Sequence, residues 1–174
     1  MPGMGDARFA RSVVLVVSHG EDGAMGLVLN QPVASPGFVD VLEELDIDVT
    51  ADRGELPIVL RGGPVEQGRG FVLHTLDHSD PGTLRVGDDL GMSTTLEILR
   101  KVASPEPPRR SALFLGYAGW ASGQLEDEIG ANGWLTLPEA EALVFDVGPA
   151  ETYAAALSRL GIDEVSLSGT AGHA

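Results

Sequence analysis

Short runs of apolar and β-branched residues alternate with glycine-rich turns along the chain. Residues 12–19 are almost continuously apolar, which predicts a central strand covered on both faces. A turn at residues 20–23 separates this run from a second one at residues 24–30, and the two runs together predict a β-hairpin. Further strands are expected at residues 58–60, 69–75, 90–93 and 111–117.

Apolar residues at helical spacing predict two helices in the first two thirds of the chain. Phe38, Val41, Leu42 and Leu45 recur on one side of the first, and Ser35-Pro36 is expected to form its cap and first turn. The second helix is expected to open at Thr94, with Glu97 at capping-box spacing and with Leu96, Leu99 and Ala103 on its buried stripe.

The last third of the chain predicts two more helices and two extended segments. A short helix is expected over residues 122–131 with Ser122 as its cap, and a last one from Gly148 to Gly161. Residues 134–137 and 142–147 are expected to be extended. Because strands and helices mix without strict βαβα alternation, the pattern predicts an α+β fold.

Composition narrows the classes of function. The chain has 174 residues, 43% of them hydrophobic, which suits one folded domain. Its formal net charge of −15 repels nucleic-acid phosphates and anionic membranes, so we expect no direct nucleic-acid partner and no membrane association. No apolar stretch approaches the roughly 20 residues of a membrane span.

The chain contains no cysteine. Disulfides, thiolate metal sites and cysteine nucleophiles are therefore excluded, and a cytosolic (cytoplasmic) location is expected. The five apolar residues 13–17 are fewer than the about 7–15 of a signal-peptide core, which agrees with that expectation.

The segment from Arg61 to Gly70 is the strongest candidate for chemistry. Its glycines, Gly62 and Gly63 among them, could let backbone amides form an anion-binding nest, and Arg61 and Arg69 could clamp a carboxylate or phosphate. It has neither a P-loop nor a dinucleotide fingerprint. The alternative is a hairpin turn that needs glycine for its geometry.

Two histidines lie at the ends of predicted strands. His19 and His74 could converge in the fold, and a nearby Ser18 or Thr75 hydroxyl would then allow nucleophilic catalysis. No Gly-x-Ser-x-Gly elbow accompanies them, and the four histidines of the chain lack zinc-motif spacing. Structural histidines with satisfied hydrogen bonds are the alternative.

Residues 116–135 hold both tryptophans of the chain. The aromatic residues could line a ligand cleft or an interface, or they could fill the core beside a crowded turn. Acidic residues in the first helical turn complement the helix dipole, and no calcium or magnesium pattern surrounds them, so no metal site is expected. The candidate residues of this segment are Tyr117, Trp120, Gln124, Glu126 and Asn132.

Eight motifs in a fixed order give the chain a strong resemblance to the YqgE/AlgH family of small bacterial proteins. They run from the first residue to about Asp163. The motifs are Met1-Pro-Gly-Met4, Phe9-Ala-Arg-Ser-Val13, Gly23-Ala-Met-Gly-Leu-Val-Leu-Asn30, Gly62-Gly-Pro-Val65, Arg69-Gly-Phe-Val-Leu-His74, Gly116-Tyr-Ala-Gly-Trp120, Gly123-Gln-Leu-Glu-Asp-Glu-Ile129 and Asn132-Gly-Trp-Leu135.

The resemblance implies an α+β domain over residues 1–165, with a branched, mostly antiparallel sheet that curls into a pseudo-barrel flanked by helices. Residues 166–174 are expected to form a disordered tail. The resemblance implies no reaction, cofactor or catalytic residue, although some members are labelled transcriptional regulators. Ser18 stands where many relatives carry a cysteine, so a thiol-based role does not extend to this chain.

Three functional hypotheses follow. The first is a non-enzymatic protein, monomeric or weakly self-associating, that binds a partner protein or a small anionic ligand without a cofactor. Its surface would combine the segment of residues 61–74 with that of residues 116–135. The second is a hydrolase or transferase that uses His19 or His74 as base. The third is the transcriptional regulator of the family label, for which direct DNA binding is not expected.

Overall fold

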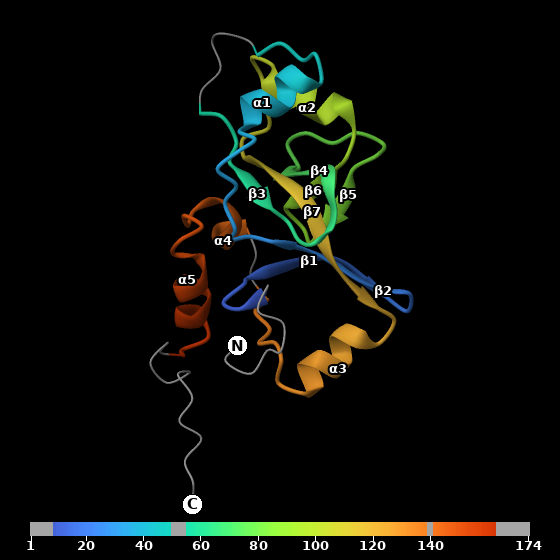
Figure 1. The fold of residues 1–174 in the computed structure, drawn as a ribbon, viewed down its shortest axis with the longest axis vertical. Coiled ribbons are helices and arrows are strands. Elements are labelled where there is room, and N and C mark those ends of the chain that lie inside the picture. The colour runs from blue at the N-terminus through green and yellow to red at the C-terminus, as the bar shows by residue number, and fades with distance from the viewer. Residues whose placement is uncertain (1–8, 50–54, 139–140, 163–174) are drawn as a thin grey trace, which may run out of the picture.

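The longest strands, β4 (Val65–Thr75) and β7 (Ser111–Ala121), pair at the centre of a seven-stranded sheet (Figure 1). The structure is a computed structural model, and it describes residues 9–49, 55–138 and 141–162. β7 also pairs with β2 (Gly23–Val28) through residues 118–121 and, in parallel, with β3 (Val59–Arg61) through residues 113–115. Because β2 and β3 both pair with β7, the sheet is branched.

The sheet is almost closed. Its main order is β1-β2-β7-β4-β6-β5, in which β1 (Val14–Gly20), β5 (Leu84–Val86) and β6 (Leu90–Ser93) complete the set. The two strands at the ends of this order, β1 and β5, approach each other in space. All pairings except that of β3 are antiparallel. The predicted α+β fold with a curled, branched pseudo-barrel is therefore confirmed.

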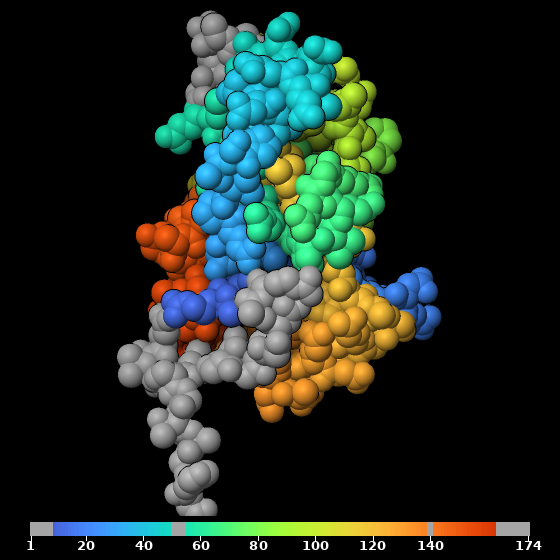
Figure 2. Space-filling model, in the orientation of Figure 1, coloured from blue at the N-terminus to red at the C-terminus, as the bar shows by residue number. Residues whose placement is uncertain are grey.

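The described residues form five short helices, which lie around the sheet. Two of them, α1 and α2, lie together at one end of the molecule, and α3 lies at the other end (Figures 1 and 2). The helices are α1 (Phe38–Glu44), α2 (Leu96–Ala103), α3 (Gln124–Gly130), α4 (Glu141–Phe145) and α5 (Thr152–Arg159).

Residues 71–75 of β4 and residues 112–114 of β7 are buried on both faces of the sheet. Phe71 lies opposite Phe114 and faces one apolar cluster, which the side chains of β1, β2 and α4 complete. The next pair, Val72 and Leu113, faces a second cluster formed with α1 and α2. Since alternate residues of a strand point to opposite faces, two cores require the continuous apolar runs that the sequence shows here.

The prediction of a central first strand was wrong. β1 is at one end of the sheet, and Val16 on it is 41% exposed. Its run is apolar because its two faces contribute to different clusters: Leu15 and Val17 pack in the first core, whereas Val14 packs beside Trp120. A continuous apolar run thus indicates a strand with two apolar faces. A strand at the end of a sheet can have two such faces, as a central strand does.

Four helices begin later than predicted, among them α5, which begins at Thr152 rather than at Gly148. α1 follows Gly37 rather than Ser35, and α2 is capped by Thr95, whose hydroxyl accepts a hydrogen bond from the Ile98 amide at 3.4 Å. α3 follows Gly123, which is left-handed at φ 75°. The predicted cap of α3, Ser122, instead donates a 2.5 Å hydrogen bond to the Glu21 carbonyl.

Other boundaries also differ from prediction. Residues 142–147 are mostly helical, as α4, because one apolar face of this segment packs into the first core. β4 begins at Val65 and β7 continues to Ala121, so both strands are longer than expected. Strand β5 was missed, and Leu96 is exposed rather than on the buried stripe of α2. The predicted tail at residues 166–174 lies outside the described residues.

Candidate functional site

The glycine-rich segment after β3 crosses β7 at backbone contact distance. A Cβ atom on Gly62 would lie 2.1 Å from the Gly116 carbonyl oxygen, and one on Gly63 would lie 2.1 Å from the Tyr117 carbonyl carbon. The Gly62 amide donates to the Leu115 carbonyl at 2.9 Å. Both glycines are buried, so their small size serves strand packing. The two glycines pack against β7 rather than forming the anion-binding nest that the sequence offered as a candidate. The alternative, a hairpin turn, does not describe the segment either, because β3 and β4 pair with β7 and not with each other.

The first residues of β4 leave the ladder and return to it. Val65 is opposite Tyr117, but Gly70 is already opposite Leu115, so residues 66–69 bulge outward. Glu66 adopts a φ of 47° in this bulge. The Arg69 guanidinium donates to the Glu66 carboxylate at 3.2 Å and lies 5.2 Å from the centre of the Phe71 ring. The bulge therefore presents one cation and one anion side by side.

A cleft of about 590 Å³ opens at this end of the curled sheet, and we call it the barrel mouth. Six strands and their turns contribute to it, which places it where barrel folds commonly bind ligands. Its lining consists of Ser18, Asp22, Gly23, Ala24, Met25, Glu66, Arg69, Phe71, Gly82, Leu84, Met92, Thr94, Tyr117, Gly119 and Trp120.

The barrel mouth brings together three of the ten predicted site residues, namely Arg69, Tyr117 and Trp120. The Tyr117 ring meets the Phe71 ring edge to face, with centroids 5.7 Å apart. Arg61 is exposed but does not line the cleft, and Gly62 and Gly63 are buried against β7. The remaining candidates, His74, Gln124, Glu126 and Asn132, also lie outside it.

The two tryptophans share one carboxylate. The indole N–H groups of Trp120 and Trp134 donate to Oε2 of Glu128 at 3.0 and 2.7 Å, and Gln124 donates to its Oε1 at 2.9 Å. Burial raises the pKa of Glu128, but these three hydrogen bonds outweigh it and hold the pKa below its ordinary value. The rings also meet edge to face at 5.9 Å. Within this network the acidic residue that matters most is Glu128, which was not among the candidates.

Glu126 and Asn132 have separate local roles. The Glu126 carboxylate pairs with the His19 ring across 107 residues of sequence, and both side chains are exposed. Its pKa is lowered by its own backbone N–H and by His19. Asn132 is left-handed at φ 57°, in the turn after α3. The pair of Glu126 and His19 connects α3 to the β1–β2 hairpin, and Asn132 reverses the direction of the chain after α3.

His74 is a buried structural residue. It is fully buried, with Nδ1 3.0 Å from the Thr75 carbonyl oxygen and Nε2 3.0 Å from the Ser93 hydroxyl. Burial is the main cause that lowers its pKa. His74 pairs with Ser111, the first residue of β7. His19 pairs with Ala24, and Ala24 pairs with Trp120, which is near the last residue of β7. The two histidines therefore lie near opposite ends of β7. They do not converge, and the alternative of a structural histidine with satisfied hydrogen bonds describes His74.

Sequence reasoning missed the residues that make the barrel mouth polar on its rim. Asp22, Glu66 and Thr94 come from three separate turns or strand ends, and only the curl of the sheet brings them together. In the sequence, the features that could have indicated this cleft are the turn at residues 20–23 and the glycines that flank the bulge. Among the described residues, no group of three or more His, Cys, Asp or Glu side chains is arranged to hold a metal ion. None of the helices described is long and apolar enough to cross a membrane.

Known proteins are similar to this chain in sequence and in fold. The profile of the AlgH-like family matches residues 1–165. The chain belongs to this family. It is 49% identical to a UPF0301 protein of Paracoccus denitrificans and 45% identical to one of Rhodospirillum rubrum, and it spans 93% and 90% of their lengths. In both comparisons all of this chain is covered.

Two solved structures have the same architecture. The solution structure of the AlgH protein from Pseudomonas aeruginosa matches with a TM-score of 0.79 at 44% identity, covering all of this chain and 92% of that one. The crystal structure of a Corynebacterium diphtheriae protein matches with a TM-score of 0.71 at 26% identity, covering 91% and 82%. The resemblance drawn from the eight motifs is therefore confirmed, and both solved structures are similar to this chain in fold.

Proposed function

We propose that this AlgH-like protein is a non-enzymatic binding protein, and that its barrel mouth recognises a basic segment of a partner protein. The observation that carries the proposal is the meeting of Arg69, Tyr117 and Trp120 in one open cleft with two carboxylates. The volume of about 590 Å³ lies within the range of roughly 300–1,000 Å³ that is typical of ligand-binding clefts.

The charges at the barrel mouth favour a cationic over an anionic ligand. Asp22 and Glu66 each carry a negative charge there, and the single cation, Arg69, is already paired with Glu66. The net charge of −15 for the whole chain adds a long-range attraction for basic partners. A small anionic ligand, the other possibility raised by the sequence, would have to displace Glu66 from Arg69.

The aromatic floor suits the same partner. The Tyr117 ring is partly exposed and is backed by the buried Phe71 ring, and a lysine or arginine stem can pack on Tyr117 while its charged end reaches a carboxylate. Leu84 extends this apolar surface at the rim, where it is 43% exposed. Such a mixture of aromatic centre and charged rim is typical of protein interfaces.

Neither competing hypothesis gains support from the site. No histidine lines the barrel mouth, so this cleft lacks the base proposed for a hydrolase or transferase. Direct DNA binding by a regulator is disfavoured by the same carboxylates and by the overall negative charge.

A photo-crosslinking experiment tests the proposal. Leu84, which lines the cleft, is replaced in bacterial cells by the photoreactive residue p-benzoylphenylalanine, and Arg85, its exposed neighbour outside the cleft, receives the same replacement as a control. We expect a defined crosslinked partner from position 84 only. The double change Asp22→Asn and Glu66→Gln should abolish the product without lowering the melting temperature.

Equal products from both positions, or none from position 84, would contradict partner binding at the barrel mouth. The small-ligand alternative is examined by adding phosphate or citrate to the wild-type protein and measuring its melting temperature. We expect no saturable increase, because Glu66 occupies Arg69. A saturable increase that Arg69→Ala removes would favour an anionic ligand instead.

A further inference from the structure

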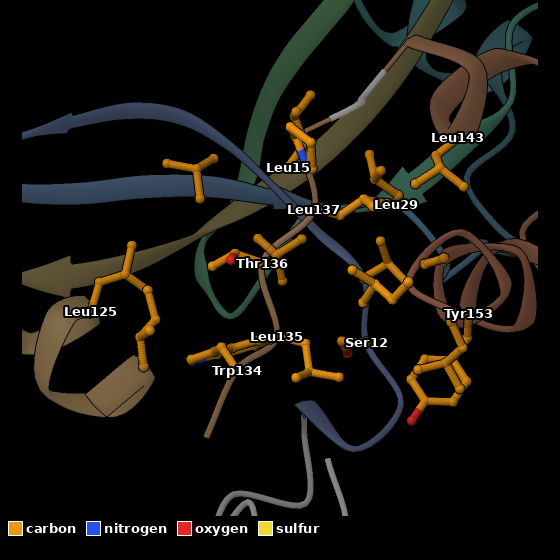
Figure 3. Close-up of a pocket in the computed structure, with 18 of the residues that line it drawn as sticks. Ser12, Leu15, Leu29, Leu125, Trp134, Leu135, Thr136, Leu137, Leu143 and Tyr153 are labelled. Atoms are coloured by element: carbon orange, nitrogen blue, oxygen red, sulfur yellow. The ribbon is translucent and has the colours of Figure 1, made fainter. Parts of the chain in front are cut away.

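A second cavity, of about 370 Å³, lies between β1, α3, α5 and the segment that follows α3 (Figure 3). Its walls are almost entirely aliphatic and aromatic. Trp134 and Leu125 are at one end, and Ser12 and Tyr153 are at the other. Val13, Leu15, Leu29, Leu135, Leu137, Leu143, Leu157 and Leu160 supply much of the wall between them.

The cavity is open to the surface through apolar residues. Val16, Ile129 and Leu135 line it, and each is between 36% and 42% exposed. Large apolar side chains that remain exposed around one opening commonly mark a binding site. Because its volume exceeds 300 Å³, the cavity is large enough to hold a small molecule, and it is too large to be a packing defect.

The two ends of the cavity differ in polarity. Ser12 and Tyr153 place hydroxyl groups at one end, and the guanidinium of Arg11 lies 4.8 Å from the centre of the Tyr153 ring. The Ser12 hydroxyl accepts a hydrogen bond from Gln31 and keeps its own proton to donate. At the other end, the Glu128 carboxylate binds both indoles and repels a second anion.

We propose that this cavity binds a single-chain carboxylate amphiphile of the fatty-acid class. The carboxylate accepts hydrogen bonds at the end formed by Ser12 and Tyr153, near Arg11, and the chain extends between β1 and α5 toward Trp134. An apolar cavity of about 150 Å³ holds benzene, with its six carbon atoms. By proportion, about 370 Å³ holds roughly 15 non-hydrogen atoms, which corresponds to dodecanoate.

This site is distinct from the barrel mouth and does not rest on the function proposed for it. Of the lining residues of the two cavities, only Trp120 is shared. Arg69 does not line the second cavity. Arg69→Ala is therefore expected to leave amphiphile binding unchanged, so that failure of one proposal is distinguishable from failure of the other.

Tryptophan fluorescence provides the assay, because the only two tryptophans of the chain both line the cavity. The full chain is titrated with sodium dodecanoate below its micelle-forming concentration, and we expect a saturable change in emission. A dodecanoate brominated at its chain end should quench more strongly than one brominated beside the carboxylate, because the chain end approaches Trp134. Dodecanol, which lacks the anionic head, should bind more weakly.

Matched substitutions on α5 test the location. Ala156 lines the cavity, whereas Ala154 is exposed on the same helix. Ala156→Leu fills the space and should weaken dodecanoate binding at least about tenfold, while Ala154→Leu should leave it unchanged. If Ala156→Leu does not fold, Leu135→Ser at the opening replaces it, with Leu96→Ser on α2, also exposed, as its control.

Four results would overturn the proposal. The first is a fluorescence change that rises linearly without saturation, and the second is equal affinity in the cavity variants and their controls. The third is stronger quenching by bromine beside the carboxylate, which would reverse the orientation. A concentration-dependent dimer that dodecanoate does not dissociate would show instead that a second copy of the chain covers this opening, and it would equally overturn the proposal.

Discussion

Glu128→Ala is expected to be strongly destabilising, although the residue lies on the surface helix α3. The change removes the common acceptor of the Trp120 and Trp134 indoles and the acceptor of the Gln124 amide. Trp120 is only 8% exposed, so its N–H cannot regain a full hydrogen bond from water. Trp134 is half-buried and can regain part of its own.

The magnitude follows from these exposures. An unsatisfied buried donor costs about 1–3 kcal/mol, and hydrogen bonds to a charged acceptor contribute at the upper end of the usual range. One fully buried and one half-buried indole N–H therefore give a loss of about 3 kcal/mol in the free energy of unfolding. The higher helix propensity of alanine offsets only a few tenths of this loss.

Glu128→Gln separates shape from charge. It keeps an oxygen for the two indoles but places an amide N–H₂ against the N–H₂ of Gln124, whose own oxygen is held by the Ala121 amide at 3.0 Å. We expect a loss of about 1 kcal/mol for Glu128→Gln at neutral pH. Glu43→Gln on α1, at an exposed position, serves as the control and should change stability by less than about 0.5 kcal/mol.

The assay is urea unfolding followed by tryptophan fluorescence and far-ultraviolet circular dichroism, at several pH values. Because the pKa of Glu128 is lowered in the folded state, its contribution is fully present above the ordinary value of 4.5. The contribution is lost as the pH falls through the lower pKa of the folded state. The gap between wild type and Glu128→Gln should therefore shrink in acid. An Ala variant as stable as wild type, or a gap that stays constant in acid, would refute the reasoning.

Two further predictions concern the fold. Gly63→Ala places a Cβ atom 2.1 Å from the backbone of β7 and should lower the free energy of unfolding, measured in urea, by at least about 2 kcal/mol. The control is Gly68→Ala, which should change this free energy little because no atom lies within 4 Å of the added Cβ. Equal stabilities of the two variants would contradict the close crossing. Because burial lowers the pKa of His74, the unfolded chain takes up this proton first as the pH falls through 6.5, so stability should decline below that pH. The His74 ring resonances in an NMR titration should stay in the neutral form as the pH falls through 6.5, and titration of His74 at its ordinary pKa would refute its burial.

The sequence predicts strand existence and the β1–β2 hairpin well, because both depend on local patterns. The turn at residues 20–23 and the apolar runs around it suffice for an antiparallel pair. Helix α4 and the edge position of β1 could not be predicted, since both depend on packing against distant segments. The same limit applies to α2, where Thr94 and Thr95 compete as caps and only geometry selects the second.

The glycine-rich segment shows why a candidate site is harder to predict than a strand. Glycine next to arginine is compatible with anion binding, but the same residues are required wherever two backbones cross at contact distance. Gly62 and Gly63 are needed for the second reason, because β7 passes over them. Of Arg61 and Arg69, only Arg69, which lies in the bulge of β4, lines the cleft. No local sequence pattern distinguishes it from Arg61.

The segment of residues 116–135 has one physical role that accounts for most of its composition. Trp120 lines both the barrel mouth and the apolar cavity. The shared Glu128 carboxylate on α3 fixes the positions of Trp120 and Trp134. If a ligand at one site displaces Trp120, we expect binding at the other site to change, and thermodynamic reciprocity requires such a coupling to act in both directions. The two proposed sites differ in their ligands but share this residue.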